Sequence, residues 1–328
     1  MSATFRYEWG TRFEDRLPSP LDPVSLGTLS WRDGSVNAAV YRGRLSAADG
    51  YALPYRLWSP RSPRGAILLL HGVCEYAGAF DAIAPYFAAL GYAALAFDQR
   101  GFGQTQTRGK WAGKSRMSHD IRDALRYLAG RVPDVPLYVL GESMGAALAV
   151  HASAQGHTAG VSGMVLVAPG ALGCTMRRIS FGLAARALQA IGARADLFVE
   201  RINADGLTPD TAIRLLADPL ILRRISPALV CGILRLGLSA FDDAPAVAAP
   251  TLTLVGSGED VSPLRCIRAL HRRFPSDASL VEFEGGPHML LHWVKREAVL
   301  NTIATWLSER TGSQTGGPSA SLPPFSDR

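Results

Sequence analysis

The sequence predicts an α/β protein with a mostly parallel, doubly wound sheet. Short apolar runs recur along the chain, and helix-length segments separate them, which is typical of parallel strands buried on both faces. These runs are Ala66–Leu70, Ala93–Phe97, Leu137–Leu140, Met164–Ala168, Thr251–Val255 and Ser279–Phe283. The intervening segments with helical periodicity include Asp81–Leu90, Ser118–Ala129 and Met144–Gln155. Since parallel strands need crossover helices, the alternation favours a doubly wound fold.

The length of 328 residues and the hydrophobic content of 48% suit one large α/β core with an insertion. Residues 1–45 are polar with several prolines and predict an N-terminal arm that leads into a hairpin around Tyr51–Trp58. The core is expected over residues 46–170 and 250–310. The tail, residues 311–328, is rich in Gly, Ser and Pro and is predicted to be disordered.

The interval between Ala168 and Thr251 contains no convincing strand. A structureless loop of that length is improbable in a compact domain, so we expect a helical cap inserted over residues 171–249. Its predicted helices are Arg177–Ile191, Thr208–Leu216, Asp218–Ile225 and Pro227–Leu238.

The charge pattern argues against a nucleic-acid-binding protein. The formal net charge is +6, and 31 of the 34 basic residues are arginines. No run of five or six like charges occurs, so a solvated arginine-rich surface is the better interpretation. Charged residues interrupt the first stretch of the chain, and no apolar run is long enough to span a membrane. Four scattered cysteines predict reduced thiols, and together these features predict a cytoplasmic protein.

The strongest chemical signal is Gly141-Glu142-Ser143-Met144-Gly145. This G-x-S-x-G sequence follows an apolar run and opens a helix of small residues, which is the strand–turn–helix setting of a nucleophile elbow. The helix N-terminus favours developing negative charge near the serine hydroxyl. We therefore expect Ser143 to be a catalytic nucleophile.

A nucleophilic serine needs a base and an orienting acid, which in this fold follow in the order serine, acid, histidine. His288 is the best candidate for the base because it follows the last apolar run, and His292 is the second choice. The acid is expected after Thr251–Val255, where Glu259 and Asp260 are adjacent. We choose Asp260, with Glu259 as the alternative, since either carboxylate can orient the imidazole.

An oxyanion hole requires two backbone N–H donors. The N–H of Met144, directly after the nucleophile, is the first candidate. The second is the N–H of Val73 in the loop that follows the first buried run, with Cys74 as its neighbour.

Three motifs occur in the order His71-Gly72-Val73-Cys74-Glu75-Tyr76, Phe97-Asp98-Gln99-Arg100-Gly101-Phe102-Gly103 and the elbow sequence. Together they resemble the monoglyceride lipase and lysophospholipase branch of the α/β-hydrolases, a serine aminopeptidase S33-type hydrolase domain. The resemblance covers about Ala66 to Leu307. It implies an α/β-hydrolase fold with a helical cap and a serine hydrolase acting on lipid monoesters.

The chain departs from the family pattern at several positions. Tyr76 stands where the family usually has His, and Thr105 stands where it usually has Ser. Ala146 replaces the second of the two glycines that usually follow the Met of the elbow motif. None of these replacements removes a catalytic atom. The family places Asp three residues after the Gly of the acid loop, where this chain has Glu259. Spacing thus favours Glu259, whereas residue type favours Asp260.

The expected function is a lysophospholipase or monoacylglycerol lipase type of carboxylester hydrolase that works through an acyl-enzyme. A small-ester esterase or acyl-thioesterase is the alternative enzyme, and a catalytically silent lipid- or partner-binding scaffold is the alternative of another class. No cofactor or metal fingerprint occurs, and the proposed reaction needs none.

Nine arginines lie in the cap region between Arg177 and Arg235. They suit either phosphate headgroups and an anionic membrane surface or solvated helix faces.

Overall fold

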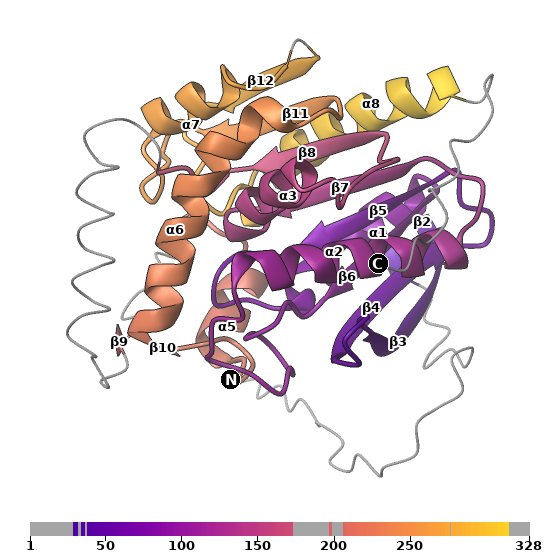
Figure 1. Cartoon of the computed structure of the whole chain (residues 1–328). Coiled ribbons are helices and arrows are strands. Elements are labelled where there is room, and N and C mark those ends of the chain that lie inside the picture. The colour runs from indigo at the N-terminus through magenta and orange to yellow at the C-terminus, as the bar shows by residue number, and fades with distance from the viewer. Residues whose placement is uncertain are drawn as a thin grey trace, which may run out of the picture.

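The computed structural model describes residues 29–31, 34–36, 38–172, 197–198, 206–275 and 277–314. Its centre is an eight-stranded sheet in the order β12-β11-β8-β7-β5-β6-β4-β3 (Figure 1). The strands are β3 (Ala38–Ser46), β4 (Ala52–Pro60), β5 (Gly65–Leu70), β6 (Tyr92–Phe97), β7 (Leu137–Glu142), β8 (Gly163–Val167), β11 (Thr251–Gly256) and β12 (Ala278–Phe283). The pairs β3·β4 and β4·β6 are antiparallel, and the other pairs in this sheet are parallel.

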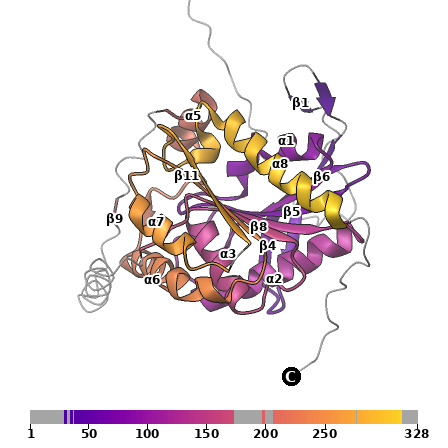
Figure 2. The same cartoon turned by 90° about the horizontal axis from the view of Figure 1, so that it is seen from above.

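Helices cover both faces of this sheet (Figure 2). One face carries α2 (Lys114–Arg131), α3 (Met144–Ala154) and α7 (Leu264–His271), and the other carries α1 (Ala84–Ala89) and α8 (Arg296–Gln314). Strands β5 to β8 and β11 are buried along their whole length, as their continuous apolar sequences require. The predicted α/β-hydrolase fold with its mostly parallel, doubly wound sheet is confirmed, and the carboxyl ends of the parallel strands define the edge where the site lies.

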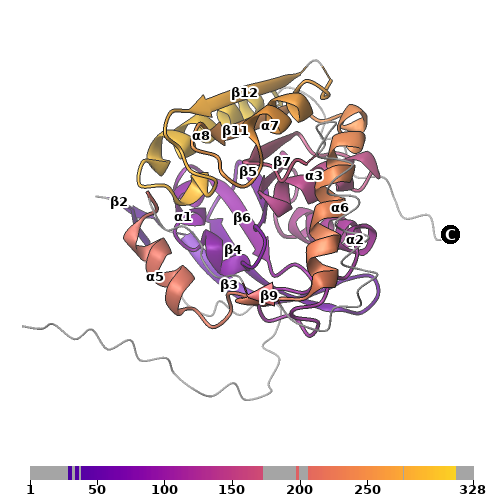
Figure 3. The same ribbon diagram turned by 90° about the vertical axis from the view of Figure 1, so that its left-hand side faces the viewer.

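The described part of the cap region contains two helices, α5 (Pro209–Ala217) and α6 (Pro227–Asp243). Figure 3 shows α6 alongside α3, whereas α5 lies on the opposite side of the view. Glycines allow α6 to pack closely: a Cβ on Gly232 would lie 2.3 Å from the Trp111 ring, and one on Gly237 would lie 2.7 Å from the Gly170 carbonyl oxygen. The cap helix α6 is thus seated directly on the region beside the elbow.

Several short elements complete the described chain. They are the strands β1 (Leu29–Trp31), β2 (Gly34–Val36), β9 (Leu197–Phe198) and β10 (Arg224–Ile225), and the 3₁₀ turns η1 (Ala77–Phe80), η2 (Ala244–Ala246) and η3 (Leu290–His292). Strand β1 pairs with β2, and β9 pairs with β10, each in a separate two-stranded sheet.

The structure corrects three predictions of local structure. Strand β3 already belongs to the central sheet, so the predicted arm over residues 1–45 extends too far, and α8 continues to Gln314, beyond the predicted end of the core. Asp218–Ile225 is not a helix, because Asp218 ends α5 in extended backbone and residues 224–225 pair with β9. The predicted helix Arg177–Ile191 and most of the tail lie outside the described residues.

The cysteines also depart from expectation. Cys74 and Cys231 are buried thiols outside any disulfide, but Cys266 takes part in a disulfide, contrary to the prediction of reduced thiols throughout. Among the described helices, none has the length and apolar character needed to cross a membrane.

Candidate active site

Ser143 lies at the sharp turn between β7 and α3, with φ of 53° and ψ of −112°. A residue other than glycine rarely adopts a backbone conformation with positive φ unless the surrounding structure enforces it. Two close backbone approaches do so here: a Cβ on Gly145 would lie 2.2 Å from the Leu70 carbonyl oxygen, and a Cβ on Gly141 would lie 2.5 Å from the Gly145 carbonyl carbon. The G-x-S-x-G sequence therefore forms the predicted elbow because only glycine fits at both flanking positions.

His288 faces the serine from the loop after β12. Its Nε2 lies 2.9 Å from Ser143 Oγ, and its Nδ1 lies 2.8 and 2.7 Å from the two carboxylate oxygens of Glu259. A proton on Nδ1 that is donated to Glu259 leaves Nε2 free to accept the Ser143 hydroxyl proton. The structure thus brings together the predicted serine, the predicted histidine and one of the two candidate acids.

The choice of Asp260 as the carboxylate beside His288 is wrong, and the alternative, Glu259, takes that place. The Glu259 side chain is fully buried, and its Oε1 also accepts hydrogen bonds from the N–H groups of Val261 and Ser262, both at 2.8 Å. Asp260 is exposed and has no hydrogen bond to His288 among those of the described residues.

Burial and Glu259 act in opposite directions on His288. Burial lowers the pKa of His288, but the hydrogen bond and the negative charge of Glu259 outweigh it, so that the pKa is raised above its ordinary value. Glu259 therefore stabilises the imidazolium that forms when the histidine accepts a proton.

The two candidate oxyanion donors flank the serine. Val73 and Met144 line the same pocket as Ser143, and no backbone hydrogen bond among the described residues uses the N–H of either. The loop of Val73 is braced by His71, which is fully buried. Its Nδ1–H donates to the Gly72 carbonyl oxygen at 2.8 Å, and its Nε2 accepts from the Gln99 N–H at 3.0 Å. Burial lowers the pKa of His71 to about 4, so this brace is neutral at pH 7.

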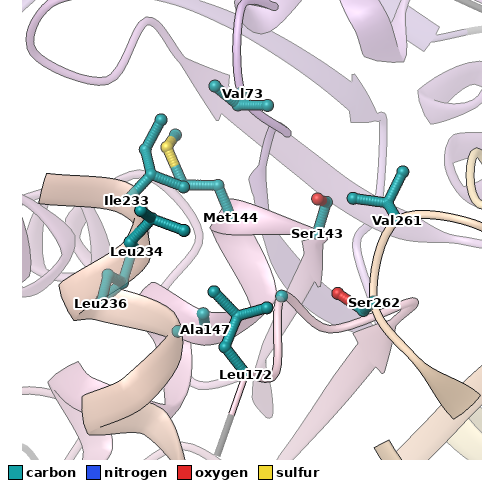
Figure 4. A pocket seen from close by; sticks show the side chains of 12 residues that line it. Val73, Ser143, Met144, Ala147, Leu172, Ile233, Leu234, Leu236, Val261 and Ser262 are labelled. Carbon is teal, nitrogen blue, oxygen red and sulfur yellow. The ribbon is translucent and has the colours of Figure 1, made fainter. Parts of the chain in front are cut away.

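An apolar pocket of about 210 Å³ opens beside Ser143 (Figure 4). Helix α6 supplies Ile233, Leu234 and Leu236 to its wall, and Val261 faces the serine from the acid loop. For comparison, an apolar cavity of roughly 150 Å³ is enough to hold a benzene molecule. The pocket can therefore accept the apolar part of a substrate whose reacting atom lies at Ser143.

A buried charged cluster lies beneath the elbow. Glu75, Glu142 and His292 have side-chain ligand atoms within 4.8 Å of one another, a spacing that would suit a metal ion. However, the Arg214 guanidinium already binds Glu75 Oε1 at 2.7 Å and supplies positive charge there. Burial raises the pKa of Glu75, but the charges of Arg214 and His292 outweigh it and hold the pKa below its ordinary value. The residues thus form a charge-paired network.

Sequence reasoning missed the roles of Glu142 and Arg214 in this network. Glu142 is the variable residue of the elbow motif, and Arg214 is one of nine similar arginines in the cap region, so neither carries a distinguishing pattern. His292, the second choice for the base, belongs to this cluster, with its Nε2 3.5 Å from Glu142 Oε2. Arg214 is therefore not one of the solvated cap arginines, because its side chain is only 17% exposed and is paired with Glu75.

Comparisons with known proteins agree with the fold. Residues 61–292 match the family model described as serine aminopeptidase, S33. The chain is 30% identical to a monoacylglycerol lipase of Mycolicibacterium smegmatis over 80% of this chain and 95% of that protein. It is also 30% identical to the monoglyceride lipase of Homo sapiens over 82% of this chain and 91% of that protein.

A solved structure shares the fold at lower identity. A soluble variant of monoglyceride lipase from Saccharomyces cerevisiae, in complex with a substrate analog, matches 80% of this chain and 93% of that chain. The TM-score is 0.70 at 20% identity. On the family match and the identity to relatives of nearly equal extent, this chain belongs to the serine aminopeptidase S33 family of α/β-hydrolases, in its monoglyceride lipase-like branch, and is a hydrolase.

Proposed function

We propose that the enzyme is a serine carboxylester hydrolase that acts on lipid monoesters, namely monoacylglycerols or lysophospholipids. The observation that carries the proposal is the hydrogen-bonded chain Ser143–His288–Glu259 at the edge of an apolar pocket. The activities of the named relatives, monoacylglycerol and monoglyceride lipases, support the same substrate class.

In the proposed reaction, Ser143 Oγ attacks the ester carbonyl carbon while His288 Nε2 takes the hydroxyl proton. The N–H groups of Val73 and Met144 donate to the oxyanion of the tetrahedral intermediate. Collapse breaks the bond to the alcohol oxygen, and His288 returns its proton to that oxygen. The acyl-enzyme remains until a water, deprotonated by His288, attacks the acyl carbon. Collapse of this second intermediate breaks the bond to Ser143 Oγ, which takes the proton back from His288, and the fatty acid is released.

Glu259 keeps the imidazole in the tautomer that this reaction requires. Its carboxylate accepts the Nδ1–H throughout and offsets the positive charge that His288 carries after taking the serine proton. The pocket beside Ser143 would hold the acyl chain, since its lining is mostly aliphatic and the carbonyl must lie against the serine.

A substrate panel tests this proposal. Purified enzyme is assayed with a monoacylglycerol, a lysophosphatidylcholine, an acyl-CoA thioester and p-nitrophenyl acetate, with the Ser143→Ala variant as the blank. We expect the two lipid monoesters to give the highest kcat/KM and the blank to give none. A preference for p-nitrophenyl acetate or the thioester would favour the alternative esterase or thioesterase, and no turnover above the blank would leave only the binding scaffold.

A further inference from the structure

The loop that carries Val73 is bound to the cap at three consecutive residues. The bonds are Leu222 N–H to the Cys74 carbonyl oxygen at 2.9 Å, Arg214 Nη2 to Glu75 Oε1 at 2.7 Å, and Tyr76 Oη to Asp218 Oδ2 at 2.6 Å. Of the three cap partners, Arg214 lies in α5, Asp218 ends that helix, and Leu222 follows in the next segment. One short cap segment therefore fixes the loop immediately after Val73.

Of the three contacts, the one between Arg214 and Glu75 joins two charged groups. The Glu75 side chain is only 5% exposed, so its carboxylate is poorly hydrated and depends on a nearby cation for stabilisation. Glu75 also lies next to the reacting centre: a Cβ on Gly72 would be 3.5 Å from Glu75 Oε2 and 3.6 Å from the Ser143 Cβ. A displacement of Glu75 would consequently displace the loop that faces the serine.

The same cluster connects the other segments of the active site. Glu142, which directly precedes the nucleophile, accepts a hydrogen bond from the Leu291 N–H at 3.2 Å through its Oε1. Leu291 and His292 lie in the turn that follows the catalytic histidine candidate. The buried cluster of Glu75, Glu142 and His292 thus joins the loop of Val73 to Tyr76 (the oxyanion loop), the elbow and the segment after His288. Arg214 binds this cluster from the cap.

We propose that Arg214 is a positioning residue that holds the oxyanion loop in register with Ser143, so that the cap takes part in building the oxyanion hole. This inference rests on the proposed function, because it requires the Val73 N–H to be an oxyanion donor. Loss of one oxyanion-hole donor costs about 10²- to 10³-fold in kcat, and misplacement of a donor is expected to cost less.

The test compares Arg214→Met with Arg214→Lys and with the matched control Arg223→Met. Arg223 lies in the same cap segment but donates to the carbonyl oxygens of Leu215 and Leu216 within the cap. Steady-state kinetics use a p-nitrophenyl ester, and the burst of p-nitrophenol counts the competent sites. Per titrated site, we expect kcat of Arg214→Met to fall about tenfold with KM within about twofold, since the loss falls on transition-state stabilisation.

Arg214→Lys should retain most of the wild-type kcat, because the ammonium keeps a cation beside Glu75, and Arg223→Met should be unchanged. A double-mutant comparison with Glu75→Gln tests whether Arg214 acts through Glu75. Once the carboxylate is removed, adding Arg214→Met should reduce kcat no further. Equal kcat per site for Arg214→Met and wild type would overturn the inference. It would also be overturned if Arg214→Met lowered kcat by the same factor in the Glu75→Gln variant as in the wild-type protein.

If Arg214→Met gives no folded protein, Tyr76→Phe tests the same inference. This change removes the Tyr76–Asp218 bond between cap and loop and leaves no unpaired charge on the loop. A fall in kcat per site without a change in KM would support the cap's role, and an unchanged kcat would overturn it. A wild-type enzyme with neither burst nor turnover would instead refute the proposed function, so the two failures are distinguishable.

Discussion

Glu259 holds the imidazole of His288 through both carboxylate oxygens, at 2.8 and 2.7 Å from Nδ1, while the adjacent Asp260 is exposed to solvent. The two residues differ by one position and one methylene group, yet only one side chain is buried against the histidine. This pair of neighbours supplies a matched test of which carboxylate serves the reaction.

Glu259→Gln is expected to lower kcat by about 10³-fold, because loss of the orienting carboxylate in a serine triad costs up to about 10⁴-fold. Asp260→Asn should leave kcat within about twofold of wild type. Steady-state assays of both variants, with unfolding midpoints recorded to show that both are folded, check this expectation. A larger loss in Asp260→Asn than in Glu259→Gln would mean that the acid loop is arranged differently.

The pH dependence follows from the raised pKa of His288. The histidine acts as a base only when neutral, and its neutral fraction grows as the pH rises through its pKa. The acid limb of kcat/KM should therefore have its midpoint above pH 6.5, the ordinary value for histidine. In Glu259→Gln the largest cause that raises the pKa is removed and only the smaller effects of Glu142 and Asp260 still oppose burial, so the midpoint should move to lower pH. A wild-type midpoint at or below pH 6.5 would contradict the assigned charge partner.

The elbow glycines give a prediction about stability. Gly145→Ala would place a Cβ 2.2 Å from the Leu70 carbonyl oxygen, so we expect a lower free energy of unfolding and loss of activity. Gly130→Ala, in α2, meets no atom within 4 Å and should instead stabilise the protein by about 0.5–1 kcal/mol, as alanine does within helices. Urea unfolding of both variants is the measurement. Tolerance of alanine at residue 145 would refute the close approach.

The pocket wall on α6 predicts acyl selectivity. Ile233→Trp fills space beside Ser143, so kcat/KM for an octanoyl ester should fall by about tenfold or more, in the range that apolar pockets discriminate. The acetyl ester of the same alcohol should react within about threefold of the wild-type rate, and Ile233→Val should change neither. Equal losses for both esters would show that the pocket does not receive the acyl chain.

The sequence predicted the sheet well because its parallel strands are buried on both faces and leave continuous apolar runs, such as β5 and β7. Ser143 and His288 were predictable because a local motif and a loop position identify them. Glu259 was harder, since spacing and residue type disagreed and only the fold shows which side chain reaches the imidazole. Arg214 could not be singled out, because its pairing with Glu75 joins residues 139 positions apart and no local pattern records that contact.

Covalent labelling by a fluorophosphonate tests the central claim, that His288 and Glu259 activate Ser143, most directly. Intact-mass analysis of the wild-type protein should show a single adduct, with peptide mapping placing it on Ser143. Ser143→Ala should show no adduct, and Glu259→Gln should label much more slowly, while Asp260→Asn labels at the wild-type rate. An unlabelled wild-type protein, or equal labelling of Ser143→Ala, would contradict the account.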